Sequence, residues 1–332
     1  MNVLHIVAGP LTGGAARGAC WLHEGLLKNS VNSIIYSNSQ SDFGYDNSVS
    51  LVPSKKGRIL NKINFLFERI LPRIFKNKNI FSTGMFGTDF TKSKVYRDAD
   101  IIHLHWINDG FVNLRHIAKI VDKPIVWTMR DMWPMTGGCH YSMGCHNFKS
   151  GCGHCPQLAR SSGNDLSKFV LNRKKKYLPR NIKIVGISDW LTSQARESML
   201  FKEFDLRTIH NNINTADFFP VDKSLAREIL GIKTNKKIIL TGSTNAKDFY
   251  KGFNKYLEAM NFLDKNQYYL CFFGELENSI ADSIGIEYKS FGYLNDSVSL
   301  RLVYSCSDVY IAPSLMDAFG KTIAESMACG TP

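Results

Sequence analysis

Two carboxylates near the end of the sequence stand where they could hold a sugar nucleotide. Asp317 and Glu325 flank Gly320, and the apolar run 308–312 before them is typical of a buried parallel strand. The apolar spacing within residues 322–328 predicts a helix that begins near Gly320. A strand, a loop and a helix amino terminus together form an anion site, because free backbone N–H groups and the positive end of the helix dipole face one crevice. The two acids would then bind sugar or ribose hydroxyls while the helix end binds phosphate.

This stretch resembles the donor-site signature of retaining glycosyltransferases of family 4, the GT-B group that moves a sugar from a nucleotide diphosphate. The matching residues are Pro313, Ser314, Asp317, Phe319, Gly320, Glu325, Met327, Ala328, Gly330 and Pro332. Asp317 stands where the family has Glu, which keeps the charge but shortens the reach by one methylene. An ordinary strand–helix unit with surface acids is the alternative. The resemblance implies an α/β protein of the GT-B fold, with two Rossmann-like domains facing a cleft.

The same resemblance assigns a set of donor contacts. Lys251, followed by Gly252, matches the family's diphosphate lysine, although the Arg that accompanies this lysine in the family is absent. Lys247 could replace that Arg as a point charge, and a surface lysine is the alternative interpretation of Lys251. The remaining donor-binding residues that the resemblance implies are Gly13, Gly14, Gly242, Ser243, Phe319, Gly320 and Lys321. A plain tight turn at residues 9–14 is the alternative for the first two.

Residues 130–141 resemble a second segment found in bacterial surface-polysaccharide transferases, in which a His-Asp pair precedes W-x-x-T-G-G-C-H-Y. The matching residues are Trp133, Thr136, Gly137, Gly138, Cys139, His140 and Tyr141. Asp131 matches the Asp and is the expected acceptor-side carboxylate, whereas Arg130 replaces the His that contacts the transferred sugar. Arg130 could bind a hydroxyl or a phosphate with its fork of donors. We expect His103 and His105 to be packing or loop-positioning residues.

Four cysteines lie within one short segment. Cys139, Cys145, Cys152 and Cys155 run C-x5-C-x6-C-x2-C, and four soft ligands ending in a C-x2-C pair could form a structural zinc site. Reduced cysteines lining a loop and disulfides are the alternatives. A catalytic metal is disfavoured, because four thiolates would leave no open position.

Charge is distributed unevenly along the 332 residues, whose net charge is +12. Residues 1–180 hold 25 Lys and Arg against 11 Asp and Glu, and residues 181–332 hold 16 against 18. A basic first half could meet nucleic acid, an anionic membrane or phosphorylated substrates. No nucleic-acid-binding motif accompanies it, so we expect no nucleic-acid partner. The sequence also has no apolar run of membrane-spanning length and begins with a strand pattern rather than a signal peptide, which predicts a cytoplasmic protein.

Residues 58–78 have the pattern of a basic amphipathic helix. Ile59, Ile63, Leu66, Phe67, Ile70 and Ile74 share one face, with Lys and Arg at many other positions. Such a helix can lie in a membrane interface, here the inner face of the cytoplasmic membrane. The alternative is a helix packed on the domain core with a solvated basic face. Pro72 is expected to kink it.

The basic run 173–176 and Pro179 indicate a linker. We therefore expect an acceptor-side domain over residues 1–180 and a nucleotide-sugar donor domain over 181–332. Family members continue past the Gly-Thr-Pro at residues 330–332, so the resemblance implies an incomplete second domain and a fragment.

The function these patterns predict is retaining transfer of a sugar from a nucleotide-diphosphate donor to a lipid-linked or saccharide acceptor. Lys251, Asp317, Glu325, Asp131 and Arg130 are the expected catalytic residues, and no metal is required for the chemistry. A catalytically weak or inactive sugar-nucleotide-binding fragment is the alternative. A GT-B epimerase or phosphorylase is disfavoured because neither combines these motifs.

Overall fold

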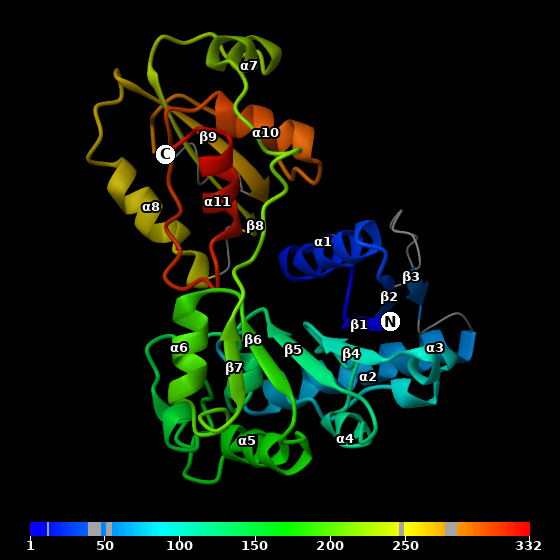
Figure 1. Ribbon diagram of the computed structural model, residues 1–332. Coiled ribbons are helices and arrows are strands. Elements are labelled where there is room, and N and C mark those ends of the chain that lie inside the picture. The colour runs from blue at the N-terminus through cyan, green and yellow to red at the C-terminus, as the bar shows by residue number, and fades with distance from the viewer. Residues whose placement is uncertain (12, 39–47, 51–54, 246–248, 276–283) are drawn as a thin grey trace. The chain divides into compact units, whose positions relative to one another are not determined.

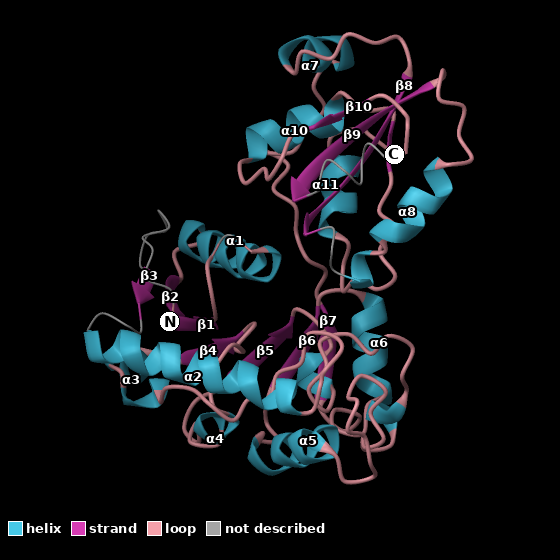
Figure 2. Ribbon diagram, turned by 180° about the vertical axis from the view of Figure 1, so that it is seen from behind, coloured by secondary structure: helices cyan, strands magenta, loops and turns pink. Residues whose placement is uncertain are grey.

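The computed structural model describes residues 1–11, 13–38, 48–50, 55–245, 249–275 and 284–332. The chain forms two compact units, Met1–Asn211 and Asn212–Pro332. Each unit is built on a parallel β-sheet with helices packed against it, as Figures 1 and 2 show. The α/β class expected from the sequence is confirmed.

The first unit extends further along the chain than the expected boundary at residue 180. The strand at Lys183–Gly186 pairs with Ile125–Met129 and then with Asp205–Thr208, so both later strands belong to the first sheet. The basic run that indicated a linker lies instead within the helix Leu166–Tyr177. Two of its basic residues, Arg173 and Lys174, are buried, so a run of charge does not by itself indicate a solvated linker. Domain membership depends on which strand supplies the next row of backbone hydrogen bonds.

The first sheet has the strand order β3-β2-β1-β4-β5-β6-β7. Its strands are β1 (Asn2–Val7), β2 (Asn32–Ser37), β3 (Ser48–Ser50), β4 (Ile101–Leu104), β5 (Ile125–Met129), β6 (Lys183–Gly186) and β7 (Asp205–Thr208). The helices are α1 (Gly14–Lys28), α2 (Lys55–Ile74), α3 (Lys94–Asp98), α4 (Leu114–Ile117), α5 (Leu166–Tyr177) and α6 (Asp189–Glu197). Helix α1 covers one face of the sheet, and α2, α4 and α5 lie on the other (Figures 1 and 2).

The second sheet has the order β10-β9-β8-β11. Its elements are α7 (Lys223–Ile229), β8 (Lys237–Asn245), α8 (Phe253–Met260), β9 (Tyr268–Glu275), β10 (Tyr288–Ser290), α10 (Ser297–Ser305), β11 (Val309–Tyr310) and α11 (Lys321–Ala328). Alternate residues of β8 and β9 face opposite sides, as the two-residue period of a strand requires. Ile239 and Leu270 pack against α8, whereas Leu240 and Cys271 pack in the cluster that includes Tyr304 of α10.

Helix α2 has its polar side turned inward. Asn64 and Glu68 are buried, and Glu68 accepts hydrogen bonds from the backbone N–H groups of Thr83 and Gly84. The apolar residues on the other side, Ile59, Ile63, Leu66, Phe67, Ile70 and Ile74, are all exposed, with Ile59 at 59%. The alternative in which this face packs on the domain core is therefore wrong. No described helix is both long and apolar enough to cross a bilayer.

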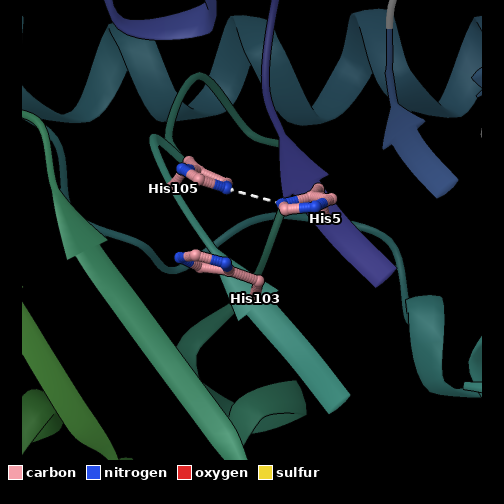
Figure 3. A group of neighbouring side chains, drawn as sticks. All are labelled: His5, His103 and His105. Atoms are coloured by element: carbon pink, nitrogen blue, oxygen red, sulfur yellow. Dashed lines mark hydrogen bonds between the residues drawn. The ribbon is translucent and has the colours of Figure 1, made fainter. Parts of the chain in front are cut away.

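Three buried histidines occupy the centre of the first sheet (Figure 3). His5 lies on β1, His103 lies on β4, and His105 follows that strand. The rings of His103 and His105 stack with centroids 4.2 Å apart, and His103 Nε2 lies 2.8 Å from the Thr128 hydroxyl. These contacts are those expected of packing residues.

Acid should destabilise the protein through this cluster. Burial, together with the positive charge of Arg130, lowers the pKa of His103 to about 3. Between that value and its ordinary value of about 6.5 the unfolded chain binds the additional proton, so stability is lost as pH falls below about 6.5. One histidine contributes at most about 1.4 kcal/mol per pH unit.

We therefore expect His103→Gln to reduce the loss of unfolding free energy between pH 7 and pH 4.5, measured by denaturant titration at each pH. The exposed His154 provides the control substitution His154→Gln. Equal pH slopes for wild type and His103→Gln would contradict this prediction.

Candidate functional site

In the second unit, Asp317 organises the start of helix α11. Its Oδ1 accepts hydrogen bonds from the backbone N–H of Gly320 at 3.2 Å and of Phe319 at 3.4 Å. Gly320 caps the helix in the left-handed conformation and brings no side chain to it. The acid therefore holds the loop, while the helix amino terminus has no side-chain cap.

Lys251 and Asp317 form an ion pair. Lys251 Nζ lies 2.8 Å from Asp317 Oδ2, and about a quarter of each side chain is exposed. Burial by itself would raise the pKa of Asp317, but the Lys251 charge and the two backbone N–H groups outweigh it and hold that pKa below its ordinary value. Two loops far apart in the sequence therefore present one cation and one carboxylate together.

Backbone contacts hold the Lys251 loop against the Asp317 loop. The N–H of Leu315 donates to the carbonyl of Tyr250 at 2.8 Å. Gly252 has a φ of 65°, and a methyl group added there would stand 2.0 Å from the carbonyl oxygen of Pro313. Only glycine permits both this dihedral angle and this approach.

Glu325 is buried on α11 with one oxygen satisfied. Its Oε2 accepts a hydrogen bond from the Tyr304 hydroxyl at 3.0 Å. Its Oε1 lies 3.4 Å from Lys321 Nζ but has no hydrogen-bond partner among the described residues. A buried acceptor without a donor is costly, so Glu325 offers a place for a ligand hydroxyl.

Tyr310 and Tyr304 are site residues that the sequence patterns did not single out. The Tyr310 hydroxyl donates to the carbonyl of Gly242 at 3.1 Å. Burial raises the pKa of Tyr310, and the nearby carboxylates of Glu325 and Asp317 raise it further. Both tyrosines lie in apolar runs, which predict core residues. Only the three-dimensional structure shows that they lie beside Glu325 and Asp317.

Two predicted donor contacts in this unit are not placed by the structure. Lys247 lies outside the described residues, and of Ser243 only its backbone position in β8 is described. Gly242, Phe319, Gly320 and Lys321 lie with the acids on the segments described above.

In the first unit, Gly13 and Gly14 lie at the start of α1. Gly13 is the cap residue, with no side-chain cap, and Gly14 opens the helix. Both are exposed. This arrangement places backbone N–H groups and the positive end of the helix dipole where an anion could reach them.

Arg130 is a buried cation without an acidic partner among the described residues. Its side chain donates to Asn211 Oδ1 at 2.9 Å and to His105 Nδ1 at 3.1 Å, while its Nε has no partner there. Burial lowers the pKa of Arg130 to about 10. Gly18 leaves room for it, because a methyl group there would lie 2.4 Å from Arg130 Nη1. A buried, unpaired guanidinium is suited to an anionic ligand.

The Arg130 contact sets the tautomers of the histidine cluster. A guanidinium only donates, so His105 Nδ1 accepts and its Nε2 carries the proton. That proton points to His5 Nδ1, 2.9 Å away, as Figure 3 shows. His5 then carries its proton on Nε2, which is buried without a partner among the described residues. The ligand nitrogens of the three rings lie within 4.8 Å of one another, but two lone pairs are occupied and a guanidinium stands beside them, which disfavours a metal ion there.

Asp131 is held inside the first unit on both oxygens. Its Oδ2 accepts from Trp106 Nε1 at 3.0 Å and lies 2.6 Å from His140 Nδ1, and its Oδ1 accepts from the Trp133 N–H. His140 Nε2 lies 2.9 Å from the Ser82 hydroxyl. The order Ser, His, Asp is that of a hydrolase triad, but all three side chains are buried. Their geometry is that of a network that orders the 131–140 loop.

The four clustered cysteines line one cavity of about 10 Å³ in the first unit. None of them forms a disulfide. Burial raises the pKa of Cys139 to about 12 and that of Cys152 to about 11. Disulfides, one of the alternatives for this segment, are therefore not present in the structure, and the Cys139 and Cys152 thiols are neutral in the absence of an ion.

Gly252→Ala should weaken nucleotide binding by displacing Lys251. A left-handed alanine costs about 1 kcal/mol, and the clash with Pro313 must move the Lys251 loop in addition. Gly292→Ala is the matched control, because Gly292 has nearly the same φ and an added methyl would meet no described atom within 4 Å. We expect a small loss of thermal stability in Gly292→Ala, a larger loss in Gly252→Ala because of the clash with Pro313, and weaker binding of nucleoside diphosphates by calorimetry in Gly252→Ala alone. Equal nucleotide affinity in the two variants would contradict the role assigned to the Lys251 loop.

Comparison with known proteins identifies the second unit. Residues 222–332 match the family described as Glycosyl transferases group 1. These residues include the Lys251–Asp317 pair and Glu325.

The whole chain is similar to proteins of related description. It is 23% identical to the "Putative colanic acid biosynthesis glycosyl transferase WcaC" of Escherichia coli K12, over 100% of this chain and 82% of that protein. Among solved structures, sucrose-phosphate synthase of Thermosynechococcus elongatus matches with a TM-score of 0.67 at 17% identity, over 100% of this chain and 80% of that one. Anabaena HepE in complex with UDP and glucose matches with a TM-score of 0.62 at 14% identity, over 100% and 79%. Residues 222–332 therefore form a group 1 glycosyltransferase domain, and the fold of the whole chain is similar to that of GT-B glycosyltransferases.

Proposed function

We propose that this glycosyltransferase is a retaining enzyme of family 4 that transfers a sugar from a nucleoside diphosphate to a lipid-linked or saccharide acceptor during synthesis of a bacterial surface polysaccharide. The observation that carries the proposal is the Lys251–Asp317 ion pair at the start of α11. Similarity to a protein named for colanic acid synthesis supports the choice of pathway class. A similar fold that holds UDP and glucose supports the choice of donor class.

The chemistry assigned to the second unit is stabilisation of the leaving diphosphate. The Lys251 ammonium and the amino terminus of α11 supply positive charge where negative charge develops as the glycosidic bond to phosphate breaks. Asp317 fixes that ammonium and binds the sugar. Glu325 Oε1, which is ion-paired with Lys321 but accepts no hydrogen bond from the described residues, accepts a ribose hydroxyl. Because these groups neutralise the phosphates, the proposed reaction requires no divalent metal.

In the first unit we assign contacts with anionic and hydroxyl groups to Arg130, Gly13 and Gly14. Arg130 brings a positive charge that no described carboxylate neutralises. Asp131 acts by positioning, because both of its oxygens are occupied by Trp106, His140 and Trp133. It holds the loop that follows Arg130 rather than receiving a proton from the acceptor.

Lys251→Ala and Glu325→Gln should each weaken binding of the nucleotide sugar about 10-fold or more, because each removes a hydrogen bond to or from a charged group. Lys255→Ala is the control, since Lys255 is exposed and pairs only with nearby Glu258 among the described acids. Wild type and variants would be titrated with UDP-, GDP- and ADP-sugars by calorimetry, and turnover measured with the donor that binds. Unchanged affinity in both site variants, with binding intact in wild type, would overturn the site.

The stereochemistry tests the mechanism directly. An α-linked donor should give an α-linked product, assigned by NMR of the purified glycoside. A β-linked product would overturn retention. Tight donor binding without product, across lipid-linked and saccharide acceptors, would favour the alternative of a weak sugar-nucleotide-binding protein.

We further propose that α2 places this enzyme on the inner face of the cytoplasmic membrane. The exposed apolar face of α2 is bordered by Arg58, Lys62, Arg69 and Arg73, whose spacing puts them along one line of the helix. Arg69 is ion-paired with Asp109, which leaves the other three as the basic edge. The single acid of the helix, Glu68, is buried. An apolar stripe with a basic edge suits an anionic lipid surface, where each basic residue contributes about 1 kcal/mol. A lipid-linked acceptor would be found at that surface.

Replacing Ile63, Phe67 and Ile70 with Ser should abolish sedimentation with vesicles that contain anionic lipid. Replacing Arg58, Lys62 and Arg73 with Gln should weaken it and remove its salt dependence. The control for charge is the exposed set Lys202, Lys233 and Lys255 changed to Gln, and the control for hydrophobicity is Phe262→Ser, at a side chain 90% exposed. Wild-type protein that stays in the supernatant would overturn the lipid assignment. A wild-type dimer that dissociates in the Ser variant would also overturn it, because the apolar face would then be a dimer interface.

A further inference from the structure

The segment between residues 136 and 165 is long and almost without regular structure. The described elements within it are one short 3-10 turn, Asn147–Lys149, and isolated bridges. Connections of this length are uncommon inside a compact domain unless something else orders them. The four cysteines of the chain's first unit that lie outside α1 are all in this segment.

The structure brings these four side chains to one place. Cys139, Cys145, Cys152 and Cys155 all line the 10 Å³ cavity, whose volume is about that of one water-sized sphere. His146 and His154 are exposed and do not line it. Of the seven Cys and His side chains in this segment, only the four cysteines line the cavity. No three of these sulfurs lie mutually within the 4.8 Å that the three histidines of the His5 cluster meet, so an ion would draw them together.

The backbone around the cavity places N–H groups near two of the cysteine sulfurs. Cys152 takes the left-handed conformation at a φ of 56°. Its sulfur lies within reach of the Gly137 N–H, and the Cys155 sulfur within reach of the Gln157 N–H. Such N–H groups stabilise a thiolate. The C-x2-C turn is also fastened to the start of α5, because the Cys155 N–H donates to Asp165 at 2.8 Å and the Gly153 N–H to Ser167 at 3.0 Å.

A buried lysine stands beside these thiols, and burial lowers the pKa of Lys174 to about 7. Lys174 of α5 is fully buried, donates to the carbonyl oxygens of Trp133 and Thr136, and has no ion pair among the described residues. Among the ionisable groups around it, Cys139 and Cys152 have the largest effect in raising the pKa of Lys174, ahead of Asp131 and Glu68. Four thiolates around one divalent ion leave a net charge of −2, which the Lys174 ammonium would partly balance.

We propose that Cys139, Cys145, Cys152 and Cys155 bind one zinc ion in a closed tetrahedral site that orders the 136–165 segment. Zinc favours four thiolate ligands at about 2.3 Å. The ion is structural, since no coordination position is left for substrate. Its consequence for the enzyme is indirect: Cys139 adjoins His140, which holds Asp131, so the ion would stiffen the loop that carries the Arg130–Asp131 pair.

The full chain, purified without chelator or affinity metal, should contain close to one zinc per chain by elemental analysis. Cys152→Ser with Cys155→Ser should lose it. Cys20→Ser with Cys271→Ser is the matched control, because both are buried cysteines outside the segment, and it should keep its zinc. Chelator should lower the thermal midpoint of wild type and of the control pair.

Cobalt titration keeps the proposal testable if the double variant does not fold. Chelated wild type given Co²⁺ should develop the thiolate charge-transfer and intense visible bands of a tetrahedral cobalt centre, and Zn²⁺ should abolish them. Wild type with well under one zinc, no cobalt bands and a thermal midpoint that chelator does not change would overturn the site. Zinc retained by the Cys152/Cys155 double variant would also overturn it. Neither result bears on sugar transfer, which is assayed separately.

Discussion

The ion pair between Lys251 and Asp317 is the contact on which the proposed donor site depends. It joins the loop after β8 to the loop after β11, two strands that neighbour each other in the sheet although many residues separate them. Parallel strands release their loops at the same edge, so a cation from one loop and a carboxylate from the other meet there. Gly252 and Gly320 make the pairing possible, because each takes a left-handed turn beside one member of the pair. The ion pair at this edge of the sheet therefore depends on the backbone conformation of the two glycines.

The first unit uses buried polar groups differently. Arg130, His105 and His5 form a chain of donors and acceptors whose proton positions follow from the guanidinium at its end. Asp131 and His140 form a second network beside it. Such networks are stable only when every buried polar atom has a hydrogen-bond partner. Two of the buried atoms without a partner in the described structure, Arg130 Nε and His5 Nε2, belong to the network of Arg130, His105 and His5. Unsatisfied donors at a cation suggest that an anionic ligand completes the arrangement.

The spacing of apolar residues in α2 correctly predicts an apolar helix face but does not say whether that face is buried or exposed. The spacing of Ile59, Ile63 and Phe67 predicts an apolar face whether that face lies inside or outside. The structure decides, because Glu68 is tied to the Thr83–Gly84 backbone and turns the polar side inward. One buried carboxylate with several donors thereby exposes a row of large apolar residues. An exposed apolar face of this size is typical of a surface that contacts another molecule or a membrane. Its basic border favours an anionic lipid surface.

The sequence by itself determined the amino-terminal strand, the amphipathic helix near residues 58–78, the strand and helix around Gly320 and the resemblance to a donor motif, since strand and helix periodicity and the Gly320 to Glu325 spacing are local properties. It also identified the four cysteines as a set, because their spacing is short. It did not identify β2, β3 or β7, and it assigned part of α5 to a linker. Only the tertiary structure decided the boundary after Asn211, since β6 and β7 join the first sheet through hydrogen bonds that no local pattern records. Tertiary packing likewise revealed Tyr304 beside Glu325 and enclosed Asp131 on both oxygens. Charge partners and burial arise between residues distant in the chain, so a motif can name a catalytic carboxylate but cannot say which of its oxygens is free.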